Sequence, residues 1–138
     1  MMNSKVWVRL FMMISFWAFA SIGISNFIVD PHQQYRISTF YPVHFHNQRY
    51  QNAGFAKNFQ YDSALVGTSM SENFILSEVE TLLNFNKALK LTISGGSSKE
   101  QSVTLQTAID NNESLKNVVW EIHMSTFVGN VDRLRNGE

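Results

Sequence analysis

Two short turns rich in glycine and serine carry the residue types best suited to chemistry in this chain. Gly67-Thr68-Ser69 follows one short strand-like run, and Ser94-Gly95-Gly96-Ser97 follows another. Each turn precedes a stretch of helical character, where free backbone amides and the helix dipole favour developing negative charge. A serine hydroxyl in that position is suited to nucleophilic attack. We therefore predict Ser69 as the catalytic residue.

The second turn is suited to a supporting role. Glycine lets a backbone amide approach a reacting group without a Cβ in the way, so the amides of Gly95 and Gly96 are predicted as oxyanion donors. A simpler interpretation covers both turns, because Ser69-x-x-Glu72 and Ser97-x-x-Glu100 both match the helix capping box. The glycine pair also fits a plain tight turn, and it lacks the spacing and the lysine of phosphate-binding loops.

The composition excludes several other kinds of site. The chain has no cysteine, which rules out disulfides, thiolate metal sites and a cysteine nucleophile. Eleven basic residues balance eleven acidic ones, so a nucleic-acid partner is not expected. His44 and His46 have the spacing of two ligands on one strand face, but no acidic residue or further histidine lies beside them. We interpret both as surface or packing histidines and expect neither a metal nor a cofactor.

Periodicity predicts the elements that must position the two turns. Strand-like runs at 61–66, 89–93 and 117–124 alternate with helical stretches at about 71–83 and 98–111. This alternation indicates βαβ units and a parallel sheet. Ligands of such sheets bind beyond the carboxyl ends of the strands, which is where both turns lie.

The predicted fold class is α/β, with an N-terminal transmembrane helix followed by the first part of a parallel-sheet αβα sandwich. Three strands and two helices leave one face of the sheet poorly covered, so we expect a truncated chain. We divide the chain into a signal-anchor segment at 1–29, a juxtamembrane segment at 30–59 and a partial α/β domain at 60–138. The middle segment has no sustained period, and we expect it to pack on the domain rather than to form its core.

The first segment has the features of a membrane span. Residues 10–24 carry no charge, and the apolar stretch continues to Val29. Its length of roughly 20 residues suffices to cross about 30 Å of hydrocarbon. Lys5 and Arg9 come before it and no acidic residue does, so the positive-inside rule predicts a cytoplasmic N-terminus.

We accordingly expect residues 6–29 to contact the lipid bilayer as a single-pass anchor in the inner (cytoplasmic) membrane. The part of the chain after Asp30 is then periplasmic or extracellular, and Asp30-Pro31 ends the helix because the residue before proline leaves the α region. A cleaved signal peptide is an alternative, since Ala18-Phe19-Ala20 has the small-x-small form of a cleavage site. A buried core helix is another.

The chain carries a recognisable set of motifs: Arg49-Tyr50, Gly54, Tyr61-Asp62, Gly67-Thr68-Ser69-Met70 and Ser94-Gly95-Gly96. With these motifs it resembles, from about Asp30 to its end, a family of largely uncharacterised bacterial membrane-anchored proteins with an SGNH-hydrolase-like domain. The resemblance implies an αβα sandwich of SGNH or flavodoxin type. That family is related in outline to the GDSL esterases and to proteins of cell-envelope polysaccharide O-acetylation. The resemblance implies a nucleophile at Ser69 and an oxyanion amide at Gly95 or Gly96. Thr68 replaces the usual aspartate, and the Gly-x-Asn-Asp and Asp-x-x-His motifs are missing.

The function that this resemblance implies is ester hydrolysis or acyl transfer through an acyl-serine, on a glycan or lipid ester of the cell envelope. Without the acid–base pair, we expect this chain by itself to be inactive. His123 is interpreted as a packed or edge residue rather than the base, because it alternates with Ile122 and Met124 on a strand. The alternative function is a non-catalytic envelope scaffold or binding protein that retains the fold.

Overall fold

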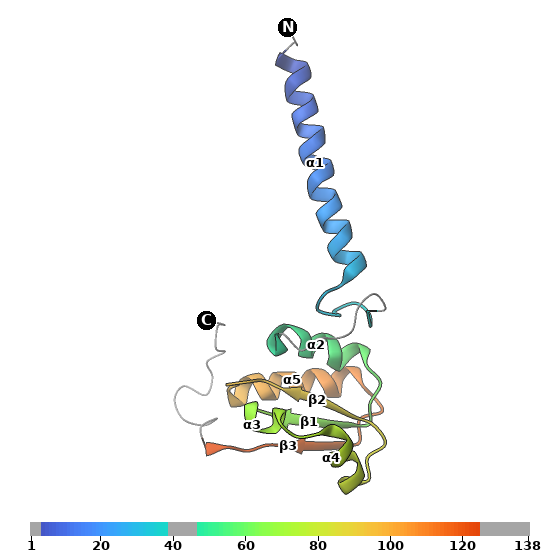
Figure 1. Ribbon diagram of the computed structural model, residues 1–138, viewed down its shortest axis with the longest axis vertical. Helices are drawn as coiled ribbons and strands as arrows, with labels where there is room; N and C mark the ends of the chain where they lie inside the picture. The colour runs from blue at the N-terminus through green and yellow to red at the C-terminus, as the bar shows by residue number, and fades with distance from the viewer. Residues whose placement is uncertain (1–3, 39–46, 125–138) are drawn as a thin grey trace. The chain divides into compact units, whose positions relative to one another are not determined.

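The computed structural model of the chain describes residues 4–38 and 47–124. The long N-terminal helix and the α/β domain are separate compact units and are considered one at a time. The first helix is α1 (Ser4–Val29), and the domain has the order α2 (Gln48–Asn58), β1 (Ser63–Gly67), α3 (Ser69–Glu72), α4 (Leu76–Leu83), β2 (Ala88–Thr92), α5 (Ser98–Asn111) and β3 (Asn117–Trp120) (Figure 1).

Helix α1 has the length and composition of a membrane span. Its 26 residues extend over roughly 39 Å at 1.5 Å per residue, which exceeds the ~30 Å of a bilayer's hydrocarbon core. None of its residues is buried, so the alternative of a buried core helix is wrong. It ends at Val29, and Asp30 before the proline has a left-handed φ of 46°. The helix is suited to be a single-pass anchor or a signal sequence.

The domain is built on a parallel sheet of three strands in the order β2-β1-β3. β1 is the central strand, and all five of its residues are buried. Val66 pairs with Leu91 on one side and with Trp120 on the other. The predicted α/β class with a parallel sheet and an N-terminal apolar helix is therefore confirmed, and the strand order is that of the first strands of a doubly wound sheet.

One face of the sheet carries the hydrophobic core. Alternate residues of β1 and β2 belong to this core together with residues of α2 and α5. Figure 1 shows how the two helices lie against the sheet. Phe55 and Ala56 of α2 are fully buried there, so our expectation that the segment 30–59 stays out of the core is wrong. The helix was missed because its sequence, QRYQNAGFAKN, is mostly polar and buries two apolar side chains next to buried Gln51 and Asn52.

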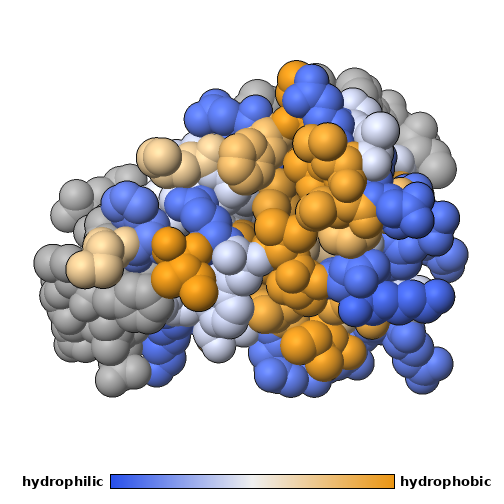
Figure 2. All heavy atoms as spheres, turned by 90° about the horizontal axis from the view of Figure 1, so that it is seen from below, coloured by the Kyte–Doolittle hydropathy of each residue, from blue (hydrophilic) through white to orange (hydrophobic). Residues whose placement is uncertain are grey.

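The opposite face is covered more thinly, by α3 against β1 and β2 and by α4 against β2. No residue of α4 is buried, and its Leu82 and Leu83 are exposed. β3 is an edge strand, and its Val118 and Trp120 are exposed although Trp120 points to the face that carries α5. Figure 2, which views the molecule from below Figure 1, shows a band of hydrophobic residues between hydrophilic ones.

The helix predicted at 71–83 is in fact two helices, α3 and α4, separated by Asn73–Ile75. The break has a tertiary cause. Lys90 on β2 donates from Nζ to the carbonyl oxygens of Glu72 and Phe74, at 2.7 Å each. These carbonyls would accept intrahelical bonds if the helix continued, so the lysine ends α3 after one turn. The helix predicted at 98–111 has the bounds of α5.

Candidate functional site

The two glycine turns lie side by side at the carboxyl edge of the sheet, as the parallel strands require. Gly67, the last residue of β1, is paired with Thr92, the last residue of β2. The Gly67 carbonyl accepts a hydrogen bond from the Ile93 amide at 2.9 Å. In the strand order β2-β1-β3 the chain moves from one side of β1 to the other, and such a switch point is where doubly wound sheets bind ligands.

Ser69 is the first residue of α3, and its side chain is exposed. The N-cap is Thr68, whose hydroxyl accepts a hydrogen bond from the Met70 amide at 3.4 Å. No hydrogen bond joins the Ser69 hydroxyl to another residue of the described ranges. The capping box expected from Ser69 and Glu72 is therefore not formed, and the Ser69 hydroxyl is left exposed at the end of the central strand.

The start of α3 is held by a residue that the sequence analysis did not assign to the site. Glu121 follows β3 directly, and its carboxylate accepts hydrogen bonds from the Thr68 amide at 3.0 Å, the Thr68 hydroxyl at 2.8 Å and the Ser71 amide at 3.1 Å. It also accepts a short hydrogen bond from the buried Ser71 hydroxyl. We call Thr68, Ser71 and Glu121 the carboxylate cluster.

The carboxylate cluster strongly favours the ionised form of Glu121. Burial by itself penalises the charge, but the bonds donated by Ser71 and Thr68 outweigh it and lower the pKa of Glu121 from 4.5 to about 2. A carboxylate with so low a pKa is a weak proton acceptor. Its negative charge also occupies the helix N-terminus, where an external anion would otherwise bind. Glu121 therefore caps the start of α3 in its ionised form.

A signal for Glu121 was present in the sequence. In a strand, neighbouring side chains point to opposite faces, and Trp120 and Glu121 do so here. The Trp120 indole donates to Gln101 Oε1 of α5 at 2.7 Å, whereas Glu121 reaches α3. A lone acidic residue at the end of a parallel strand is thus placed to meet the turn after the neighbouring strand. What the sequence does not show is that β3 pairs with β1.

The turn after β2 is closed by residues near one another in the sequence. The Ser97 hydroxyl accepts from the Glu100 amide at 3.3 Å, and the Glu100 carboxylate accepts from the Ser97 amide at 2.9 Å. This capping box was predicted and is confirmed. Arg49 of α2 adds an ion pair with Glu100 at 2.9 Å. Burial opposes ionisation of Glu100, but the bonds from Arg49 and Ser97 prevail and lower its pKa.

The two glycines proposed as oxyanion donors differ in their surroundings. Gly95 is exposed and has a φ of 62°, a left-handed conformation that favours glycine. Gly96 is buried, and its amide donates to the Ile93 carbonyl at 2.8 Å. In this conformation the Gly96 amide closes its own turn. By its exposure to solvent, Gly95 is the more accessible of the two to a ligand.

Three histidines were also considered for chemistry. His123 is exposed and lies beyond the end of β3, so it is not a packed strand residue. His44 and His46 lie outside the described residues. Within the described ranges, no group of three His, Asp or Glu side chains is placed to hold a metal ion. No protein-family model, curated protein or solved structure matches this chain.

Proposed function

We propose that this chain is a membrane-anchored, exported protein whose α/β domain presents Ser69 for ester hydrolysis or acyl transfer on a glycan or lipid ester of the cell envelope. The observation that carries the proposal is the position of Ser69. It is exposed, is not used as a cap, and lies at the carboxyl end of the central strand, where ligands of doubly wound sheets bind. The SGNH-like motif around Gly67-Thr68-Ser69 supports the same assignment.

The proposed chemistry has two steps. Ser69 Oγ loses its proton to a base and attacks the ester carbonyl carbon, and the alcohol leaves with a proton to form an acyl-serine. Water or an acceptor hydroxyl then attacks the acyl-serine and regenerates the hydroxyl. No described residue hydrogen-bonds to the Ser69 hydroxyl, so the proposal requires a base contributed from outside the described ranges. The backbone amide of Gly95 is the proposed oxyanion donor.

The location of this activity rests on α1. We infer that α1 is retained as a single-pass anchor of the inner membrane with its N-terminus in the cytoplasm, because Lys5 and Arg9 lie at its N-terminal end and no acidic residue precedes Asp30. A reporter fused after Asp30 should be exported and should stay with the membranes after an alkaline wash. Soluble periplasmic reporter would show cleavage after Ala20, and a cytoplasmic reporter would contradict the export.

The test of the chemistry is covalent labelling. A form of the protein that carries an Asp-x-x-His pair is purified from membranes, because the chain without that pair is expected to be inactive. It is treated with a fluorophosphonate probe and digested, and the modified residue is identified by mass spectrometry. We expect labelling at Ser69 that is lost in Ser69→Ala and retained in Ser102→Ala, an exposed serine on α5. If folded protein is labelled nowhere, or is labelled equally in Ser69→Ala, the acyl-serine proposal is wrong.

The carboxylate cluster favours a second candidate function, a non-catalytic envelope scaffold or binding protein. A carboxylate that accepts four hydrogen bonds at the start of α3 puts a negative charge beside the position where an oxyanion would form. It also makes the turn rigid without any need for chemistry. Absence of labelling together with retained fold would select this second function.

A further inference from the structure

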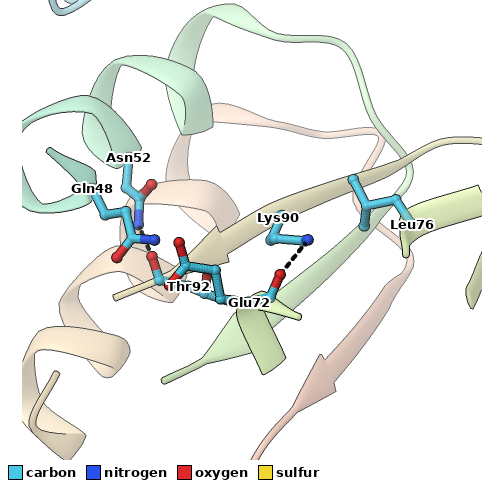
Figure 3. A pocket seen from close by; sticks show the side chains of 6 residues that line it. All are labelled: Gln48, Asn52, Glu72, Leu76, Lys90 and Thr92. Carbon is cyan, nitrogen blue, oxygen red and sulfur yellow. Dashed lines mark hydrogen bonds between the residues drawn. The ribbon is translucent and has the colours of Figure 1, made fainter. Parts of the chain in front are cut away.

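A cavity in the domain lies on the β2 side of the sheet, and Ser69 is not among the residues that line it. It has a volume of about 240 Å³ and is partly open to solvent. Sites for drug-sized ligands measure roughly 300–1,000 Å³, so this cavity suits a smaller molecule. Figure 3 shows the six side chains that line it, which come from α2, α3, α4 and β2: Gln48, Asn52, Glu72, Leu76, Lys90 and Thr92.

Two amide side chains line the cavity, and each uses one of its two polar atoms in a hydrogen bond to the backbone. Asn52 donates from Nδ2 to the Thr92 carbonyl at 2.9 Å, and Gln48 accepts at Oε1 from the Ser94 amide at 2.6 Å. Asn52 is only 2% exposed, yet its Oδ1 takes part in no hydrogen bond with the described residues. This oxygen is not among the fully buried unpaired atoms of the described residues, so it is accessible to a ligand or water in the cavity.

The charges of the cavity cancel. Lys90 is turned toward backbone, because its Nζ donates to the carbonyls of Glu72 and Phe74. The Glu72 carboxylate lines the cavity and makes no hydrogen bond with a described residue. One positive and one negative side chain give no net charge. A charged ligand therefore gains no long-range electrostatic attraction in this cavity, so the cavity does not favour an anion over a neutral ligand.

The remaining polar groups form a mixed set. Asn52 Oδ1 and the Glu72 carboxylate accept hydrogen bonds, Gln48 Nε2 donates, and the Thr92 hydroxyl does both. A hydroxyl group also donates and accepts, so several hydroxyls on one ligand can pair with acceptors and donors together. Leu76 and the aliphatic part of Lys90 add an apolar wall. We propose that this cavity binds a small neutral polyhydroxylated molecule, the size of a single sugar ring.

This inference does not depend on the chemistry proposed for Ser69, which is not among the residues that line the cavity. The experiment uses the full chain in a detergent without a sugar headgroup. D-glucose and N-acetyl-D-glucosamine are titrated in, and the side-chain amide NMR signals of Asn52 and Gln48 are followed. We expect saturable shifts of both signals with at least one of the two sugars.

Variants on α3 and α4 connect the shifts to the cavity. Glu72→Ala removes an acceptor and should weaken binding about tenfold, which corresponds to about 1.4 kcal/mol. Leu76→Trp should fill the cavity and abolish binding. The matched controls are Glu78→Ala and Leu82→Trp, which change exposed residues of α4 outside the cavity and should bind as the wild type does.

Three results would overturn the inference. The first is the absence of shifts with both sugars in folded protein, and the second is a shift that Leu76→Trp leaves unchanged. The third is saturable binding of inorganic phosphate or of zwitterionic alanine with no binding of either sugar. Ser69→Ala should bind sugar as the wild type does, so a failure of the acyl-serine proposal leaves this test unaffected.

Discussion

The helices that follow β1 and β2 are capped by acidic residues from different parts of the chain. Helix α5 is capped by Glu100, three residues after Ser97. Helix α3 is held by Glu121, 53 residues after Thr68 and on another strand. The first cap can form as soon as the local turn forms. The second cannot form until β3 has paired with β1, so it couples the candidate site to completion of the sheet.

This difference changes what each serine is available to do. At the β2 turn the Ser97 hydroxyl is used by the cap. At the β1 turn the cap uses Thr68 and Ser71, and the hydroxyl of Ser69 between them stays exposed. Because Glu121, which is distant in the sequence, caps α3, Ser69 at the start of this helix has no capping role. That is the arrangement in which a reactive serine can be kept.

The largest expected effect comes from removing the distant cap. Glu121→Ala leaves donors of Thr68 and Ser71 without an acceptor, and each unsatisfied buried group costs ~1–3 kcal/mol. We expect a loss of about 2–4 kcal/mol in the free energy of unfolding of the domain. The measurement is urea unfolding of the full chain in micelles, followed by the NMR amide signals of β1. Glu113→Ala, at an exposed position, should change it by less than about 0.5 kcal/mol.

Lowering the pH should remove the stabilisation by the Glu121 carboxylate without a mutation. The folded-state pKa of Glu121 is about 2, below its usual 4.5, so its stabilising contribution is complete above pH 4.5. It is lost as the pH falls from there toward 2. The stability gap between wild type and Glu121→Gln should therefore be widest near neutral pH and should close in strong acid. A gap that does not vary with pH would show that the charge of Glu121 is unimportant.

Replacing a glycine with alanine should destabilise the two turns for different reasons. A Cβ at Gly67 would collide with Ser71 Oγ and come within 2.6 Å of Glu121 Oε2, so Gly67→Ala should cost ~1–3 kcal/mol through overpacking. Gly95→Ala should cost about 1 kcal/mol, because of its φ of 62°. Glu121→Ala should relieve part of the Gly67→Ala penalty in a double mutant and leave the Gly95→Ala penalty as it is. Strict additivity at both glycines would contradict the clash.

The smallest expected effects on stability come from replacing Ser97 and Ser69, and they should differ between the two serines. Ser97→Ala removes a cap and should cost about 1 kcal/mol. Ser69→Ala removes a hydroxyl that caps nothing and should change the unfolding free energy by less than about 0.5 kcal/mol. Equal losses in the two variants would mean that Ser69 caps α3. That result would contradict the claim that the Ser69 hydroxyl is available as a nucleophile.

The elements with a strong local signal were predicted well. The predicted bounds of β1, β2 and α5 lie within two or three residues of the observed ones. Strand alternation, the helical period and the Ser97–Glu100 capping box all depend on residues close together in the sequence. Helix α2 was missed, since only Phe55 and Ala56 give it an apolar face. The division of 71–83 into α3 and α4 was missed as well, because it depends on Lys90 from β2.

By itself, the sequence determined the apolar length of α1, the alternation of strands and helices, and the position of Ser69 at the end of a strand. These follow from periodicity and from turn residues, which act over a few positions. Only the tertiary structure decided which acidic residue caps α3 and which serine remains exposed. The reason is physical: Glu121 meets Thr68 and Ser71 only because β3 pairs with β1, and strand pairing is a contact between residues about fifty positions apart.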